Sequence, residues 1–180
     1  RCKLPMIHYA MGLLYSCIGI MCQSSQQQSA IFYLITQLGK GTYGYVFKGI
    51  DKNDNRKVYA IKKIAGRSKR IWHSRDSLIA EITCLIELQV NPNFIHIHDY
   101  FLEPDQCYLV LELIPGKDLF DRIKQKGTFT EEEARDACRS ILEALKYMHE
   151  KRIVHRNLKP ESLLVVVSED HQRTCGLHRI

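Results

Sequence analysis

The chain has 180 residues, of which 45% are hydrophobic and 26% are charged, and its formal net charge is +6. This length suffices for one domain with a core or for two small lobes, and the composition is that of an ordinary globular protein. The basic residues are interspersed with acidic ones, apart from the basic stretch at 62–75, so we expect no nucleic-acid partner.

The seven cysteines include no C-x-x-C pair, which argues against a disulfide framework or a zinc site. Cys84, Cys107 and Cys138 lie in apolar patterns that are typical of reduced residues in a protein core. Reduced thiols indicate a reducing compartment, so we expect a cytoplasmic location.

The first thirty residues differ in composition from the rest of the chain. Residues 6–22 are apolar and uncharged apart from His8, and a run rich in Gln and Ser follows at 23–29. The apolar stretch is short for a membrane span and is diluted by glycine, serine and tyrosine, so a membrane anchor or targeting segment is the lesser alternative. We expect 1–30 to be an appendage with a flexible linker.

Three strand patterns follow, at 31–38, 45–50 and 58–62. The first two flank the sequence G-K-G-T-Y-G-Y-V at 39–46, so its G-x-G-x-x-G pattern lies in a β-hairpin and not at a strand-to-helix turn. That context argues against a dinucleotide-binding Rossmann site, in which the glycines open a helix. Taken alone, the motif is equally compatible with a plain glycine-rich turn.

Residues 74–88 carry apolar side chains at a helical period, and two antiparallel strands are expected at 94–102 and 106–113. His96 and His98 lie two residues apart on the first of these strands and therefore share one face. They are potential metal ligands, but no third ligand is evident, and solvated histidines are the favoured interpretation.

A short helix is expected from Asp118 to Lys126, with Asp118 as a suitable N-cap and Gly127 at its end. A capping box at 130–133 then starts a long helix. The apolar stripe of that helix consists of Ala134, Ala137, Cys138, Ile141, Leu142, Leu145 and Met148. A polar loop at 155–162 leads into an apolar strand, and such loops can hold charged side chains at a functional site.

Five of these motifs occur in the order and approximate spacing found in eukaryotic protein kinases. They are the glycine hairpin, V-Y-A-I-K, E-I-T-C-L, L-E-L-I-P-G and H-R-N-L-K-P-E-S, at 39–46, 58–62, 81–85, 111–116 and 155–162. The stretch from Ile31 to Val167 therefore resembles the Ser/Thr protein kinases. The sequences at 119–123 and 147–150 are similar to those of calcium/calmodulin-dependent kinases.

The resemblance implies an α+β, protein-kinase-like fold, with an N-terminal antiparallel β-sheet lobe that carries one helix, followed by the first part of a helical C-lobe. It divides the chain into the appendage at 1–30, an N-lobe and hinge at 31–114, and a partial C-lobe at 115–180. The last of these ends near the position of the D-F-G motif.

The resemblance also implies a site for ATP. Its phosphate side would consist of Gly39, Gly41, Gly44, Lys62 and Glu81. The glycines let backbone N–H groups approach phosphate oxygens because no Cβ intervenes. The lysine would pair with the α- and β-phosphates, and the glutamate would orient the lysine.

The adenosine side of the same site is implied by the hinge and its neighbours. Leu111, as gatekeeper, with Glu112 and Ile114 would line the adenine edge, where backbone groups form hydrogen bonds with the base. Val46, Ala60 and Leu164 would form apolar walls around the adenine ring. Asp118 would reach the ribose hydroxyls.

The polar loop departs from the family pattern H-R-D-L-K-P-E-N at two positions. Asn157 stands where the family has its catalytic Asp, and a neutral amide cannot take the proton of a substrate hydroxyl. A positioned base contributes about 10²–10⁴-fold to a rate. Ser162 replaces a metal-binding Asn and is a shorter, poorer ligand, and no carboxylate precedes Gly176, so we expect weakened Mg²⁺ binding. Lys159 matches the family and would contact the γ-phosphate.

We therefore predict a Ser/Thr protein-kinase-like domain that binds ATP and transfers phosphate little or not at all, as a pseudokinase or truncated isoform. Its expected partner is a full-length kinase or another protein. One alternative is an active Ser/Thr kinase that transfers the ATP γ-phosphate to protein, and another is an interaction module that binds no nucleotide.

The chain begins with Arg1 and stops at Ile180, so we expect a fragment or a processed product. An incomplete helical lobe would leave the long helix with an uncovered apolar face. We expect marginal stability or dependence on a partner as a result.

Overall fold

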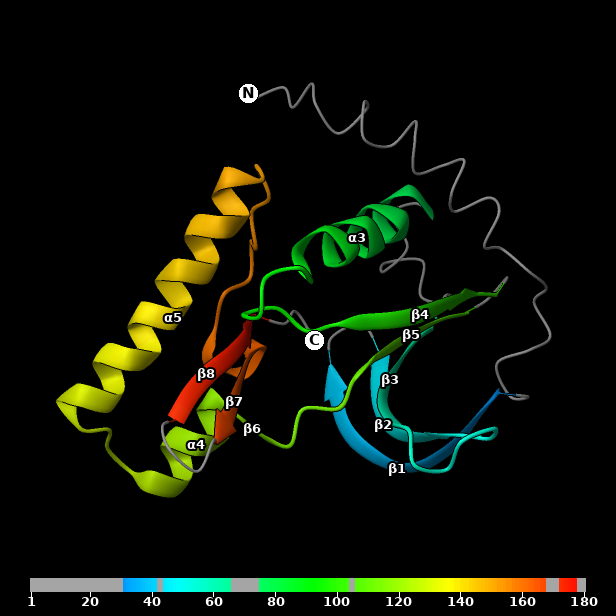
Figure 1. Cartoon of the computed structure of the whole chain (residues 1–180), viewed down its shortest axis with the longest axis horizontal. Coiled ribbons are helices and arrows are strands. Elements are labelled where there is room, and N and C mark those ends of the chain that lie inside the picture. Colours follow the sequence, from blue (N-terminus) through cyan, green and yellow to red (C-terminus); the bar gives the residue numbers. More distant parts are fainter. Residues whose placement is uncertain (1–30, 42–43, 66–74, 104–105, 168–171, 178–180) are drawn as a thin grey trace.

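The computed structural model describes residues 31–41, 44–65, 75–103, 106–167 and 172–177. Within these ranges, a five-stranded sheet with one helix precedes two further helices and a three-stranded sheet (Figure 1). We call the first group the sheet lobe and the second group the helical lobe. The predicted α+β fold, with an antiparallel sheet lobe and part of a helical lobe, is confirmed.

The sheet of the first lobe is antiparallel throughout, with the strand order β1-β2-β3-β5-β4. Three strands in series, β1 (Phe32–Gly41), β2 (Gly44–Asp51) and β3 (Val58–Ala65), form one side of it. The other side is the pair β4 (Ile97–Leu102) and β5 (Gln106–Glu112), with β5 beside β3. All five strands correspond to strand patterns in the sequence.

Helix α3 (Arg75–Leu88) lies along one face of this sheet (Figure 1). Its Leu78 and Ile82 are buried against Ile64 and Leu109 of the sheet in the main core cluster. The opposite face carries a second cluster, which consists of Phe32, Ile61, Tyr108 and Val110. Because side chains alternate along β3, Ala60 and Ile64 face α3, and so does the residue midway between them, Lys62.

The stretch 94–96, which the sequence analysis assigned to a strand, is irregular. Phe94 and Ile95 are both buried, but Phe94 packs in a cluster of the helical lobe and Ile95 in the core of the sheet lobe. The regular pairing with β5 starts with Ile97 opposite Leu111, so β4 begins only at Ile97.

The helical lobe begins with α4 (Leu119–Lys126) and α5 (Glu131–Glu150). As predicted, the Asp118 carboxylate caps α4 by accepting the N–H of Asp121 at 2.8 Å, and Gly127 follows the last turn with a φ of 82°. A positive φ of this kind favours glycine at the end of a helix.

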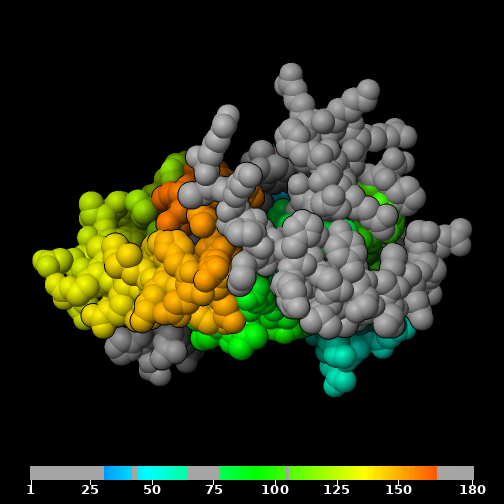
Figure 2. Space-filling model, turned by 90° about the horizontal axis from the view of Figure 1, so that it is seen from above, coloured from blue at the N-terminus to red at the C-terminus, as the bar shows by residue number. Residues whose placement is uncertain are grey.

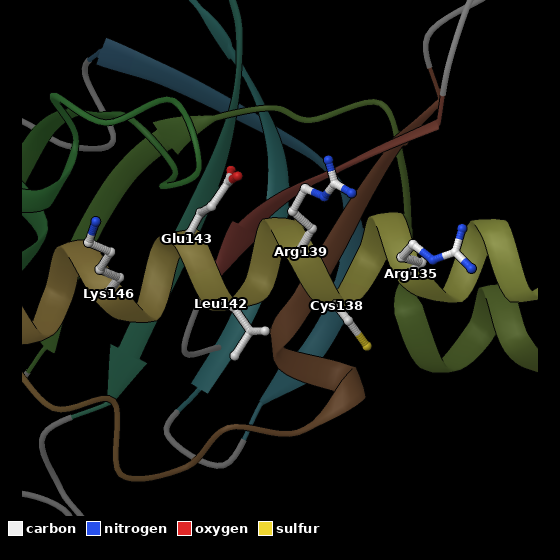
Figure 3. Close-up of a pocket in the computed structure, with 6 residues that line it drawn as sticks. All are labelled: Arg135, Cys138, Arg139, Leu142, Glu143 and Lys146. Atoms are coloured by element: carbon white, nitrogen blue, oxygen red, sulfur yellow. The ribbon is translucent and has the colours of Figure 1, made fainter.

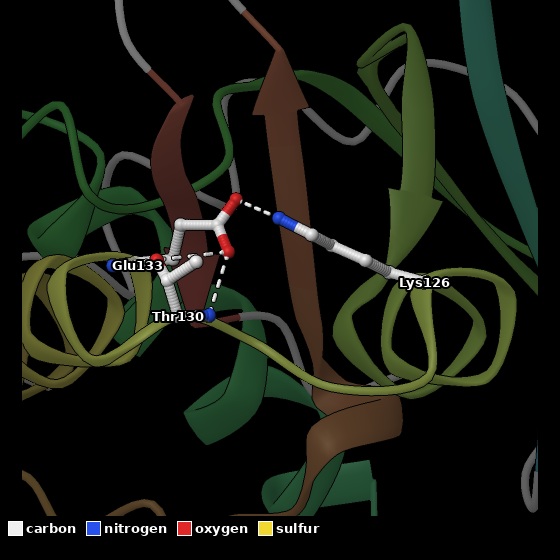
Figure 4. Close-up of polar contacts among 3 residues, drawn as sticks. All are labelled: Lys126, Thr130 and Glu133. Atoms are coloured by element: carbon white, nitrogen blue, oxygen red, sulfur yellow. Dashed lines mark hydrogen bonds and ion pairs between the residues drawn. The ribbon is translucent and has the colours of Figure 1, made fainter.

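The predicted capping box of α5 is also present. Thr130 Oγ1 accepts the Glu133 N–H at 3.2 Å, and Glu133 Oε2 accepts the Thr130 N–H at 2.9 Å. Lys126, the last residue of α4, donates to the same carboxylate. Its hydrogen bond links α4 to Thr130 and Glu133 at the start of α5 (Figure 4). These hydrogen bonds, that of Lys126 first, lower the pKa of Glu133.

The helical lobe also contains a second antiparallel sheet, with the strand order β6-β7-β8. Its strands are β6 (Gly116–Asp118), β7 (Leu163–Val167) and β8 (Gln172–Leu177), and a 3₁₀ turn, η1 (Pro160–Ser162), immediately precedes β7. The sequence analysis predicted β7 but assigned no strand to β6 or β8. The backbone of Asp118 lies opposite Leu164 in this sheet.

The apolar stripe of α5 is buried over only part of its predicted width. Met148 and the unpredicted Ala144 are buried, whereas Leu142 is 65% exposed and Cys138 is exposed as well. Figure 3 shows Cys138 and Leu142 pointing to the same side of the helix, in a hollow whose lining is Arg135, Cys138, Arg139, Leu142, Glu143 and Lys146. The prediction of a core position was therefore wrong for Cys138. It was right for Cys107, and Cys84 is half-buried.

The two lobes meet where α3 ends. Leu88 and Phe94 pack with Met148 of α5 in one buried cluster, and the Phe94 ring lies 6.0 Å from that of Tyr147. Lys151, just after α5, reaches Glu87 at 3.8 Å. In the space-filling view, the orange surface at the end of α5 borders the green surface that follows α3 (Figure 2). This joint fixes α3 relative to the helical lobe.

Among the described residues, none of the helices is long and apolar enough to cross a membrane. The apolar stretch at 6–22, which carries the alternative of a membrane anchor, lies outside the described residues.

The capping box of α5 can be tested by substitution. Thr130→Ala removes the hydroxyl that accepts the Glu133 N–H, so we expect the free energy of unfolding to fall by about 1 kcal/mol. Urea unfolding at pH 7 measures the change. Thr130→Ser keeps the hydroxyl and should retain most of the stability, so an equal loss in both variants would contradict a capping role.

Candidate functional site

The glycine hairpin joins β1 and β2, with Gly39 opposite Val46 and Gly41 opposite Gly44. A Cβ at Gly44 would overlap the carbonyl oxygen of Lys63 on the neighbouring strand β3. Packing within the sheet therefore requires glycine at 44. A Cβ at Gly39 would meet nothing within 4 Å, so packing does not explain that glycine, and space beside it remains open. Residues 42–43, at the tip, lie outside the described residues.

Lys62 and Glu81 form an ion pair between β3 and α3. The lysine residue is only 1% exposed, and its Nζ lies 3.5 Å from Glu81 Oε1. The glutamate is partly exposed at the edge of the interface. A buried ammonium group is costly unless acidic groups and hydrogen bonds compensate its charge, so this pair is a structural requirement as well as a candidate site. The expected pairing is present, and the role of either residue toward phosphate stays a prediction.

Apolar residues predicted to enclose the adenine ring lie in one cluster built from both lobes. Ala60 and Leu111 are buried within it, and three partly buried residues pack against it, namely Val46, Ile114 and Leu164. Leu164 comes from β7 of the helical lobe, and the others come from the sheet and the hinge segment (Leu111–Gly116). Leu113 joins the same cluster and was missed by the sequence analysis, although its place within the hinge was a usable signal.

Two polar residues of the predicted nucleotide site have additional structural partners. The backbone N–H of Glu112 donates to the carbonyl oxygen of His96 at 2.9 Å, so this N–H is not available to a ligand. The Asp118 carboxylate accepts the Asp121 N–H at the start of α4. A carboxylate has further lone pairs, so the cap leaves one Asp118 oxygen for another donor.

The polar loop at 155–162 places Asn157 and Lys159 on the surface. The Asn157 N–H donates to Nδ1 of His155 at 3.3 Å, and Arg156 between them has a φ of 63°. Ser162 is buried instead. Its hydroxyl donates to the Lys159 carbonyl at 2.7 Å and accepts the Lys159 N–H at 3.2 Å, so it closes the turn before β7.

The loop offers two neutral side-chain oxygen groups for a metal ion, the Asn157 amide and the Ser162 hydroxyl. Mg²⁺ prefers carboxylate and phosphate oxygens, and the Ser162 hydroxyl is already hydrogen-bonded twice. Within the described residues, no group of three or more His, Cys, Asp or Glu side chains could hold a metal ion. Asp170 and the side chains of 172–177 lie outside them.

The two cysteines near the ion pair remain protonated. Burial raises the pKa of the Cys107 thiol to about 12, and burial followed by the charges of Glu87 and Glu81 raises that of Cys84. A thiolate is the nucleophilic form of cysteine, so neither residue is a candidate nucleophile.

The family model of the protein kinase domain matches residues 32–176. The chain belongs to the protein kinase family. Its relatives place it with the Ser/Thr kinases that are similar to the calcium/calmodulin-dependent group, which confirms the resemblance drawn from the motifs. ATP and protein substrates, normally with Mg²⁺, are what this family uses.

Curated relatives of the kinase domain come from several organisms. Calcium/calmodulin-dependent protein kinase type 1 of Macrobrachium nipponense is 42% identical over 127 residues, which is 71% of this chain and 36% of that protein. Type IV of Mus musculus is 42% identical over 134 residues, with 74% and 27% covered. Calcium-dependent protein kinase 29 of Arabidopsis thaliana is 35% identical over 142 residues, with 79% and 26% covered. The chain thus spans about a third or less of the length of these relatives.

The two hairpin glycines differ in a way that substitution can reveal. Gly44→Ala should lower the free energy of unfolding by about 1–3 kcal/mol, because its methyl group overlaps the Lys63 carbonyl. Gly39→Ala should change it by less than about 0.5 kcal/mol, since the methyl group meets nothing. Thermal and urea unfolding of the two variants measure the difference. Equal destabilisation would contradict the placement of the hairpin.

Proposed function

We propose that this kinase domain binds ATP between its lobes and transfers phosphate poorly or not at all, and thus acts as a pseudokinase. A contrast between two parts of the site supports this proposal. The Lys62–Glu81 ion pair is formed beside the apolar cluster, whereas the loop position of the catalytic base carries the amide Asn157.

Nucleotide binding is supported by three properties of the sheet lobe and hinge. The apolar cluster with Ala60 and Leu164 offers two walls for a flat ring. Lys62 brings a positive charge to that cluster, and Glu81 holds it in place. The open space at Gly39 lets backbone N–H groups of the hairpin approach a phosphate. ATP therefore fits the residues that are present.

Weak phosphoryl transfer is supported by the chemistry of the loop. In a kinase the loop carboxylate accepts or orients the proton of the substrate hydroxyl, and the amide of Asn157 cannot accept it. Loss of a positioned base costs about 10²–10⁴-fold in rate. Lys159 keeps a cation at the surface of the same loop, so charge neutralisation at the γ-phosphate is retained in part.

Weak metal binding completes the proposal. Mg²⁺ would neutralise the phosphates and join them to the loop. Ser162 would contribute only the lone pair that its two hydrogen bonds to Lys159 leave over. The hydroxyl is a shorter ligand than the Asn amide of the family pattern, and Thr174 and Cys175 before Gly176 supply no carboxylate, so nucleotide affinity should depend little on Mg²⁺.

We extend the proposal to domain organisation and partners. The appendage would end at 30, the sheet lobe and hinge would span 31–114, and the helical lobe would occupy 115–180. The protein would be located in the cytoplasm. The exposed Leu142 and Cys138 on α5 support a protein partner, such as a full-length kinase, that covers this face.

An active Ser/Thr kinase is the second candidate. The identity of 42% to calcium/calmodulin-dependent kinases favours it, as do the retained Lys62 and Lys159. In that case the substrate hydroxyl would lose its proton without help from a loop carboxylate, and turnover would be slow.

ATP binding can be measured by thermal shift with and without Mg²⁺. Saturation at about 100 times the Kd should stabilise the folded chain by about 2.7 kcal/mol. Lys62→Ala should abolish the shift, because it removes the buried cation. Lys57→Ala, on the exposed turn before β3, is the matched control and should shift like the parent. If the folded parent shows no thermal shift with ATP, the proposal of nucleotide binding is wrong and an interaction module is favoured.

The catalytic deficit predicts a further result. Asn157→Asp should leave phosphoryl transfer within about tenfold of the parent, because restoring a base does not restore metal binding. Transfer of labelled phosphate to a peptide pool rich in Ser and Thr is the measurement. Asn53→Asp, at an exposed turn of the sheet lobe, adds the same charge elsewhere as a control. Full kinase activity of Asn157→Asp would refute the account of the missing metal ligands.

A further inference from the structure

Two histidines lie close together on the surface of the sheet lobe, where β4 begins beside the hinge. The imidazole rings of His96 and His98 have centroids 4.6 Å apart, with their planes inclined by 48°. Both residues are exposed. The sequence analysis favoured solvated histidines because it found no third ligand, but it could not give the distance between the rings.

The backbone that carries the pair is fixed at several points. The His96 carbonyl accepts the Glu112 N–H at 2.9 Å, and the Ile97 N–H donates to Gln89 Oε1 at 3.1 Å. The Ile97 side chain is buried in the main core between the two histidines. Its two neighbours are both exposed, and their rings meet at the surface.

The surroundings of His98 hold its ring and favour the neutral imidazole. The ring of His98 packs edge-on against the Tyr59 ring, with a centroid distance of 4.9 Å. Burial, and next the neighbouring His96, lower the pKa of His98, whereas Glu112 acts in the opposite direction. A neutral imidazole has a free nitrogen lone pair, and it is this form that binds metals.

The distance between the rings suits one particular coordination geometry. A metal ion bound about 2.1 Å from one nitrogen of each imidazole lies roughly 3.2 Å from each ring centroid. When one nitrogen of each ring is turned toward a shared ion, two centroids 4.6 Å apart subtend an angle of about 90–95° at it. That angle is the one between adjacent ligands in square-planar or octahedral coordination, which Cu²⁺ and Ni²⁺ prefer.

We propose that His96 and His98 together form a binding site for a divalent late transition-metal ion, Ni²⁺ or Cu²⁺. The described residues contain no group of three suitable side chains, so water fills the remaining positions on the ion. The negative charge of Glu112 favours a cation at this place. Neither ligand is among the residues proposed to bind nucleotide, although the hinge residue Glu112 donates its N–H to the His96 carbonyl.

Titration calorimetry of the full chain with NiCl₂, under a phosphine reductant that keeps the thiols reduced, tests the site. Once one imidazole is bound, the second binds intramolecularly, so His96→Gln and His98→Gln should each weaken the affinity by about 10²-fold. Glutamine keeps a similar size, and both positions are exposed, so the variants should fold. His149→Gln, at an exposed histidine on α5, is the matched control and should bind like the parent.

The proposal stands if both substitutions weaken Ni²⁺ binding and the control does not. It is overturned if either variant binds Ni²⁺ as tightly as the parent, or if His149→Gln weakens the affinity to the same extent. A second readout is the ligand-field absorption spectrum of the Ni²⁺ complex, which shifts with the number of nitrogen ligands. Two nitrogen ligands in the parent and fewer in each variant are expected, and an unchanged spectrum in the variants would also overturn the site.

Discussion

The buried ion pair between Lys62 and Glu81 is the interaction on which the arrangement of the sheet lobe depends. Alternation along β3 directs the lysine to the same face as Ala60 and Ile64, into the core beneath α3. An ammonium group in that core requires compensation by an acid, and α3 supplies Glu81 from its edge. The same requirement that fixes α3 against the sheet also places a cation beside the apolar cluster.

The position of α3 depends in turn on the helical lobe. Its last turn enters the cluster around Met148, and the ion pair of Glu87 with Lys151 lies at the surface of the joint. Exposed ion pairs contribute little, about 0–1 kcal/mol, so the buried apolar contacts hold the joint. Because Leu164 completes the apolar cluster from the other lobe, the candidate nucleotide site exists only when both lobes are assembled.

The loop at 155–162 separates the residue that stabilises its turn from the residue that we propose to limit catalysis. Ser162 forms two hydrogen bonds with the Lys159 backbone and so stabilises the turn into β7. Asn157 lies at the surface, where exchange of a carboxylate for an amide has no cost in packing. The proposed loss of a catalytic base is therefore compatible with retention of the fold, since Ser162 and not Asn157 stabilises the turn.

The sequence by itself determined several features that depend on neighbours along the chain. The caps of α4 and α5 join residues three apart, and the strands follow from short apolar runs, so local patterns predicted them. The kinase motifs likewise predicted the pairing of Lys62 with Glu81. The tertiary structure alone decided where each side of an element packs. It placed Phe94 and Ile95 in different cores, left Cys138 and Leu142 of α5 exposed, and brought the rings of His96 and His98 together. These outcomes depend on segments that are distant in sequence, and periodicity carries no information about which face of an element a distant segment will cover.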